Sequence, residues 1–243
     1  MASLNRHVAS HASTVAERAL VRRDVAWCIC LLAALLLWDL AAQDLAMMRN
    51  WGGAAGFALR DDWITMVLLH QGGRALGWIV MALLVLQLWW PLPFWPVLPR
   101  RDRVWWLATC VLCLSLIPVL KHISLTSCPW SLSEFGGAAL YVSHWRWGIA
   151  DNGSGGCFPS GHASAAFSFL AGYFALRQAH PLAARLWLAS VVALGVLFGV
   201  GQTLRGAHYP SHTLWTAWIC LAVTTASRQA WLAWQSRTDP NAP

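Results

Sequence analysis

The chain has 243 residues, of which 58% are hydrophobic and only 11% are charged. Soluble domains carry roughly 25% charged residues, so this composition argues against a soluble protein and for an integral membrane protein. The net charge of +7 does not indicate nucleic-acid binding, because the arginines lie in short loops beside apolar runs. Attraction to anionic lipid head groups is the simpler explanation of that charge.

Six apolar runs are candidates for crossing a bilayer, and together they predict an all-α integral membrane protein, a six-helix bundle. The runs cover about residues 25–42, 75–90, 105–120, 161–176, 186–204 and 213–231. Several are shorter than the roughly 20 residues that a bilayer core requires, so we expect the helices to extend beyond them. No internal repeat or linker divides the sequence into two folded domains.

Basic residues predict the orientation of this bundle. Arginines lie before the first run, between the second and third, between the fourth and fifth, and after the sixth. Because cytoplasmic loops are enriched in Arg and Lys, we place these segments and both termini in the cytoplasm. The expected regions are a basic cytoplasmic N-terminal segment (1–24), a six-span membrane domain (25–231) and a cytoplasmic C-terminal tail (232–243). Residues 43–74, 121–160 and 205–212 are then extracytoplasmic.

The first of these outer segments, residues 43–74, is predicted to be a loop or a helix lying at the membrane interface. Arg60, His70 and Arg74 are candidate contacts for lipid head groups, and an ordinary solvated loop is the simpler alternative. Four prolines between residues 91 and 99 then predict a stiff inner loop.

The third apolar run ends at Lys121, the only lysine in a chain with sixteen arginines. Lysine carries a compact ammonium group on a flexible stem, which binds phosphate as a point charge. Taken alone, this residue is better explained as a lysine that snorkels to the membrane interface. The motifs that follow it in the sequence make phosphate binding the stronger interpretation.

Two of the seven cysteines, Cys128 and Cys157, lie outside the apolar runs. An extracytoplasmic loop is exposed to an oxidising compartment, which permits a disulfide between them. Free thiols are the alternative, because the spacing of two cysteines does not establish the geometry that a disulfide needs.

The motif from Pro159 to His162 predicts a helix N-terminus, with Ser160 as its N-cap. Unpaired N–H groups and the positive end of the helix dipole make such a terminus an anion site. Gly161 allows a ligand to approach the backbone closely, and His162 adds a proton donor. The motif therefore indicates a phosphate site at the mouth of a membrane helix.

A second motif at the outer end of the fifth run contains Arg205, His208 and His212, and its Pro210 again predicts a helix start. Three histidines, a lysine and an arginine on one membrane face suit phosphoryl transfer through histidine. A neutral imidazole attacks phosphorus, a second histidine in its imidazolium form protonates the leaving oxygen, and fixed cations hold the remaining oxygens. This chemistry requires no cofactor and no divalent metal.

These residues resemble the type 2 phosphatidic acid phosphatase (lipid phosphate phosphatase) superfamily over roughly residues 60–225. Its pattern is Lys with Arg-Pro seven residues on, then Pro-Ser-Gly-His, then Ser-Arg, five residues, His, three residues, Asp. The middle block is intact, but Cys128 and Gln202 stand where the pattern has arginine, and His212 stands where it has aspartate. Arg205 lies three residues after the usual position. The chain is similar to a bacterial membrane branch with variant first and third motifs.

The resemblance implies six helices with the active site on the extracytoplasmic face. It makes His208 the phosphorylated nucleophile and His162 the general acid, while His212 would orient His208 in place of the aspartate. The phosphate-binding residues it implies are Lys121, Ser160, Gly161 and Arg205. For the missing side chains the outer loop offers candidates, namely Glu134 or Asp151 as a carboxylate and Arg146 as a cation.

The expected function is a metal-independent phosphatase of the bacterial inner membrane, acting on a lipid phosphate or pyrophosphate at the periplasmic side. The expected partners are a phospholipid or polyprenyl phosphate substrate and membrane lipids, without nucleic acid. Candidate substrates are undecaprenyl pyrophosphate, phosphatidylglycerol phosphate and the phosphate of lipid A.

Three alternatives remain open on the sequence. One is a lipid phosphotransferase on the same scaffold. Another is a non-catalytic protein that binds or transports a lipid phosphate, which Cys128 and His212 favour. The weakest is a metal site made of His162, His208 and His212, because the motif supplies no carboxylate to complete a hydrolytic zinc set.

Overall fold

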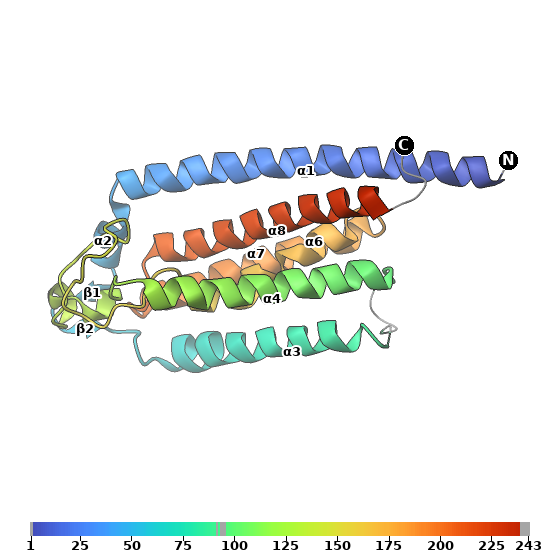
Figure 1. Cartoon of the computed structure of the whole chain (residues 1–243). Helices are drawn as coiled ribbons and strands as arrows, with labels where there is room; N and C mark the ends of the chain where they lie inside the picture. Colours follow the sequence, from blue (N-terminus) through green and yellow to red (C-terminus); the bar gives the residue numbers. More distant parts are fainter. Residues whose placement is uncertain (1, 91, 93–95, 239–243) are drawn as a thin grey trace.

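The computed structural model describes residues 2–90, 92 and 96–238 and is mostly helical (Figure 1). Five long helices run side by side along the molecule (Figure 1): α1 (Ala2–Leu40), α3 (Gly73–Leu86), α4 (Arg100–Ile123), α7 (Pro181–Leu204) and α8 (Pro210–Thr238). A π-helix, η1 (Ile64–Gly72), runs directly into α3. A sixth segment is formed by α5 (Gly161–Phe167), the 3₁₀ turn η4 (Ser168–Leu170) and α6 (Ala171–Leu176).

Within the described part of the chain, three helical segments are long and apolar enough to cross a membrane, namely Ile64–Leu86, Arg100–Ile123 and Pro181–Leu204. They correspond to three of the six expected spans. The other three expected spans are also helical: 25–42 lies almost entirely in α1, 161–176 is the α5–η4–α6 segment, and 213–231 lies in α8. The protein is therefore a mostly helical, multi-pass membrane protein by composition, and six crossings stay a prediction.

The second spanning helix begins eleven residues earlier than the sequence predicted. The sequence predicted a polar interruption up to residue 74, but the chain is helical from Ile64. Asp62 explains this start, because its Oδ1 accepts hydrogen bonds from the N–H groups of Ile64 (2.9 Å) and Thr65 (3.3 Å). His70 and Arg74 therefore lie on a membrane helix and not in an outer loop.

The α5–η4–α6 segment passes through the middle of the bundle, where α5 contacts α3, α4, α7 and α8. Small residues allow this close packing, as is common between membrane helices. A Cβ atom at Gly195 of α7 would lie 2.3 Å from the Phe167 ring, and one at Gly77 of α3 would lie 3.2 Å from the carbonyl oxygen of Ala165. The first turn of α5 is thereby held at the centre of one end of the bundle.

That end carries a folded cap, opposite the end where both termini lie (Figure 1). The cap contains α2 (Gln43–Met48), the hairpin of β1 (Gly52–Gly53) and β2 (Gly56–Phe57), and the 3₁₀ turns η2 (Pro129–Ser131) and η3 (Ser133–Phe135). Its own small core is formed by Met48, Phe57, Leu132, Phe135, Ala139 and Tyr209. Asp44 of α2 accepts hydrogen bonds from the N–H and hydroxyl of Ser211, which ties the cap to the start of α8.

Parts of two expected segments lie outside the described residues. The proline-rich inner loop includes residues 91 and 93–95, and the C-terminal tail includes 239–243, and neither stretch is described. Residues 232–238 continue α8, and residues 2–24 form the first part of α1 without a break before the first apolar run.

Candidate functional site

The predicted site residues come from helix ends that meet beneath the cap. Lys121 lies in the last turn of α4, and His162 lies in the first turn of α5. Arg205 is the residue directly after α7, His208 lies in the connection to α8, and His212 lies in the first turn of α8. The structure thus places residues from three parts of the sequence at one end of the bundle.

Distances show how closely these groups approach one another. The ring centroids of His162 and His208 are 6.2 Å apart, and those of His208 and His212 are 5.8 Å apart. A Cβ atom at Gly161 would lie 3.9 Å from the Lys121 Nζ atom, so the ammonium group lies beside the N-terminus of α5. One positive charge and two imidazoles therefore surround the same helix end.

Several buried polar atoms at this point lack a hydrogen-bond partner among the described residues. They are Ser160 Oγ, His162 Nδ1, His212 Nε2 and His70 Nδ1. Ser160 occupies the N-cap position that the sequence predicted, but its hydroxyl makes no capping hydrogen bond. Buried polar groups are normally paired, so a cluster of unpaired ones indicates a site built for a ligand.

His208 is almost completely buried, and its position is fixed from both sides. Its N–H and that of Ala207 donate to the carbonyl oxygen of Gln202, at 3.3 and 2.9 Å. Its Nδ1 lies 3.5 Å from the sulfur of Cys157. Burial, together with the charges that His212, Lys121 and His162 can carry, lowers the pKa of His208 well below that of an ordinary histidine. The imidazole is therefore neutral at neutral pH.

Cys157 belongs to a disulfide with Cys128, so the free-thiol alternative is wrong for this pair. The carbonyl oxygen of Cys157 accepts a hydrogen bond from His212 Nδ1 at 3.0 Å. A neutral imidazole has one donor and one acceptor nitrogen, so this bond makes Nε2 of His212 the acceptor. The disulfide thus positions the Cys157 carbonyl oxygen, which bonds His212, and the Cys157 sulfur, which contacts His208.

Arg205 is held by residues that the sequence reasoning did not assign to the site. Its Nε donates to the carbonyl oxygen of Arg60 at 2.7 Å. The guanidinium groups of Arg60 and Arg205 both lie over Trp130, at 4.8 and 5.9 Å from the ring centroid. The backbone N–H of Trp130 donates to the Gly206 carbonyl oxygen, so the cap loop and the α7–α8 connection together fix the position of Arg205.

His70 is the second residue that the sequence did not assign to the catalytic set. Its ring centroid lies 4.0 Å from that of His162, with 39° between the rings. Its neighbour one turn further along, Arg74, lies on the same spanning segment. The available sequence signal was two ionisable residues four apart within an apolar helix, since such residues are costly in a membrane and mark functional sites.

The candidates for the missing carboxylate and cation are engaged elsewhere or lie apart from these contacts. Glu134 pairs with Arg49 at 2.5 Å. Asp151 accepts hydrogen bonds from Ser127 and Gly153 and so holds the loop together. Arg146 is exposed in a turn of that loop. Instead, His212 faces a further histidine, His144, at 5.7 Å between ring centroids, and His144 Nε2 lies 3.4 Å from Asp39 of α1.

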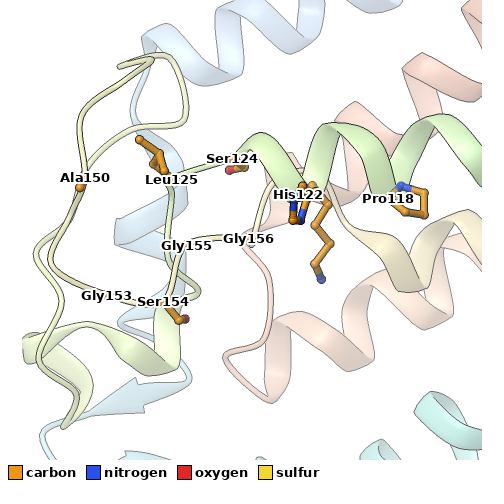
Figure 2. Close-up of a pocket in the computed structure, with 10 residues that line it drawn as sticks. Pro118, His122, Ser124, Leu125, Ala150, Gly153, Ser154, Gly155 and Gly156 are labelled. Atoms are coloured by element: carbon orange, nitrogen blue, oxygen red, sulfur yellow. The ribbon is translucent and has the colours of Figure 1, made fainter.

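A pocket of about 530 Å³ opens beside Lys121 (Figure 2). Its walls come from Pro118 and His122 of α4 and from the glycine-rich residues 153–156 of the outer loop. Of the predicted site residues, Lys121 lines this pocket, whereas Ser160, His162 and His208 are not among its lining residues.

Among the described residues, the potential metal ligands that lie close together are Cys128, Cys157 and His208, whose ligand atoms are within 4.8 Å of one another. The two sulfur atoms are joined in the disulfide, whereas cysteine binds metal as a thiolate. This grouping therefore lacks the chemistry of a metal site, and it differs from the three-histidine set that the sequence suggested.

Comparison with known families agrees with this arrangement. The PAP2 superfamily model matches residues 102–236, which is more than half of the chain. Searches among curated proteins and solved structures found no match. The matched range contains Lys121, the Pro159–His162 motif and the Arg205–His212 motif, while α1, η1 and α3 precede it. PAP2 proteins are typically metal-independent phosphatases that act on phosphate monoesters. The chain belongs to the PAP2 superfamily.

Proposed function

We propose that this protein is a membrane phosphatase that removes phosphate from a lipid phosphate or pyrophosphate through a phosphohistidine intermediate. The observation that carries the proposal is the approach of His162 and His208, 6.2 Å apart, beside the Lys121 ammonium group at the start of α5. Family membership supports the reaction class, and the unpaired polar atoms around this point support a phosphate-sized ligand.

In the proposed mechanism, His208 is the nucleophile and His162 is the general acid. The lowered pKa of His208 keeps its imidazole neutral, which is the state that attacks phosphorus. Lys121, Arg205, the Ser160 hydroxyl and the Gly161 amide bind the phosphate oxygens, and His162 protonates the leaving oxygen. Water then attacks the phosphohistidine, which releases phosphate and restores His208.

We assign to His212 the orienting role that an aspartate has in the family pattern. The bond from its Nδ1 to the Cys157 carbonyl leaves Nε2 as an acceptor, which has no partner among the described residues and belongs to a ring whose centroid lies 5.8 Å from that of His208. This acceptor is uncharged, so it stabilises the imidazolium that forms on His208 less than a carboxylate would. The substitution by histidine therefore keeps the orientation of the nucleophile and gives up part of the electrostatic stabilisation.

We place this site on the periplasmic side of a bacterial inner membrane, with six spans in residues 25–231. The segments 1–24 and 232–243 are then cytoplasmic. Several arginines support this orientation, because α4 begins with Arg100 and Arg101 at the end of the bundle opposite the cap (Figure 1). The proposed substrates are lipids whose phosphate lies at the outer surface, such as undecaprenyl pyrophosphate, phosphatidylglycerol phosphate or lipid A.

One observation favours the non-catalytic alternative, a protein that binds a lipid phosphate without hydrolysing it. Cys128, which stands at the position of a family arginine, is consumed in a disulfide, so the site has one fewer cation than the family pattern. A phosphotransferase would use the same residues with another lipid as acceptor in place of water.

Phosphate release from a panel of purified lipids in detergent tests the proposal. His208→Ala and His162→Ala should each lower the rate at least about a hundredfold, the usual effect of removing a nucleophile or general acid. His180→Ala is the matched control, because His180 bonds the Val97 carbonyl at the other end of the bundle. Unchanged phosphate release by His208→Ala contradicts the proposal, and lipid binding without any release supports the non-catalytic alternative.

A further inference from the structure

A buried carboxylate from outside the region that matches the family lies close to His212. Asp39 is in the last turn of α1, which runs alongside α8 and precedes the matched residues (Figure 1). Its side chain is only 5% exposed, and its Oδ2 accepts hydrogen bonds from the indole N–H groups of Trp145 (3.0 Å) and Trp215 (2.9 Å). A buried carboxylate at the end of a membrane helix is costly, so its presence indicates a function.

The hydrogen-bond donors of Asp39 do not neutralise its charge. Indole N–H groups are uncharged, and the second carboxylate oxygen, Oδ1, has no hydrogen-bond partner in the part of the chain that the structure describes. Among those same residues, the basic group within ion-pair distance is His144, whose Nε2 lies 3.4 Å from Oδ2. The negative charge of Asp39 therefore acts first on His144.

His144 contacts His212 as well as Asp39. Its side chain is 8% exposed, and its ring lies flat on the Phe158 ring, with 4.3 Å between centroids and 4° between planes. It meets the His212 ring edge to face, at 5.7 Å and 83°. Phe158 also contacts His212, at 5.2 Å between centroids. The His144 ring is thus held in one orientation between the carboxylate and His212.

The contacts continue from His212 to the proposed nucleophile. The ring centroids of His212 and His208 are 5.8 Å apart, and both side chains are buried. Asp39, His144, His212 and His208 therefore form one buried row of contacts. The family pattern places an aspartate directly beside the nucleophile, whereas in this chain a carboxylate lies two imidazoles further away.

We propose that Asp39 is a positioning residue that supplies, through His144 and His212, the negative charge that the family pattern places beside the nucleophile. The inference rests on the proposed function. Phosphorylation of His208 puts a positive charge on its imidazole, and a carboxylate stabilises this charge across the row because buried groups screen it less than water does. Asp39 touches no substrate and transfers no proton in this role.

A double-mutant cycle on kcat tests this role, with phosphate release from farnesyl phosphate by the purified full-length protein in detergent. Asp39→Asn keeps an oxygen that accepts from both indoles but removes the charge. It should lower kcat about tenfold, within the range that residues of one contact network show, and leave KM unchanged. In a His212→Asn background the same substitution should change kcat less than about twofold, because its effect passes through His212.

Two further variants separate the charge from the packing. Asp39→Glu keeps the carboxylate and should retain more activity than Asp39→Asn. His144→Phe keeps a ring that can stack on Phe158 and removes the nitrogen that faces Asp39, so it should show the same dependence on His212. Melting temperatures distinguish loss of folding from loss of turnover. If Asp39→Asn does not fold, the His144→Phe cycle decides by the same criterion.

Glu134→Gln is the matched control, because it removes a negative charge from the cap at an exposed ion pair with Arg49. It should leave kcat unchanged in both backgrounds. Wild-type kcat in Asp39→Asn, or an equal loss with and without His212→Asn, overturns the role of Asp39 while leaving the phosphatase intact. A wild-type protein that releases phosphate neither from farnesyl phosphate nor from the lipid panel contradicts the proposed function, and this inference with it.

Discussion

His212 lies between two groups that determine what its imidazole can do. Its Nδ1 is bound to the Cys157 carbonyl, its Nε2 has no partner among the described residues, and its ring lies 5.8 Å from His208. Substituting His212 by asparagine or by glutamine distinguishes the roles of its two ring nitrogens. An asparagine amide reaches the Nδ1 position, whereas a glutamine amide reaches the Nε2 position. The pair therefore tests which nitrogen matters for the reaction.

We expect His212→Asn to lower kcat about tenfold, because it keeps the bond to Cys157 but removes the acceptor for His208, and one such bond contributes roughly 0.5–1.5 kcal/mol. His212→Gln should lose less. KM should change little in both variants, since His212 is not assigned to the phosphate. Steady-state kinetics on one lipid phosphate measures this, and an Asn variant with wild-type kcat would contradict the orienting role.

Single residues also show where sequence reasoning succeeds and where it fails. Ser160 was predicted at a helix start because proline and serine at that spacing act through the local backbone, and α5 does begin directly after it. His70 was not assigned to the catalytic set, because its contact with His162 joins residues 92 positions apart and depends on how the continuous η1–α3 segment packs against α5. The roles of the site residues stay predictions.

At the level of elements, the link between α4 and α5 decides how the site is assembled. The Cys128–Cys157 disulfide fastens the segment after α4 to the segment before α5, over a sequence separation of 29. The sequence left this bond open, since it could not supply the geometry. The apolar runs predicted that the long helices exist. They did not predict where the second spanning helix begins, because that start depends on a hydrogen bond from the Ile64 N–H to the Asp62 side chain.

Replacing both disulfide cysteines, Cys128→Ser with Cys157→Ser, should destabilise the protein by about 2–4 kcal/mol, the usual effect of losing a disulfide. Activity should fall as well, because the Cys157 carbonyl and sulfur contact His212 and His208. Thermal unfolding in detergent and phosphate release measure the two effects. Cys30→Ser, at an exposed free cysteine, is the control. Equal melting temperatures for the double variant and the control would show that the disulfide does not stabilise the fold.

For the molecule as a whole, charged residues hold the end of the bundle opposite the site. Arg177 pairs with Glu17 and Asp24, and Arg228 pairs with Glu17 and approaches Asp102 at 3.8 Å. These ion pairs join α1, α4, α8 and the C-terminal end of α6. The sequence predicted these arginines in the cytoplasm, and the six-span orientation remains a prediction that labelling can test.

A membrane-impermeant maleimide applied to intact bacterial cells should label Ser154→Cys, in the pocket wall beside Lys121, and should not label Thr238→Cys at the end of α8. Both positions are exposed, so accessibility within the fold does not distinguish them. Labelling after the cells are opened should reach both. Labelling of Thr238→Cys alone in intact cells would reverse the orientation and move the site to the cytoplasmic face.

The central claim is that His208 becomes phosphorylated at a site that it shares with Lys121, His162 and Arg205. Its most direct test is to mix the protein with farnesyl phosphate carrying labelled phosphate, stop the reaction in alkaline detergent and map the protein-bound label. We predict an alkali-stable, acid-labile label on the peptide that contains His208, and no label in His208→Ala. A label on another residue, or turnover by His208→Ala with the label retained, would contradict the account.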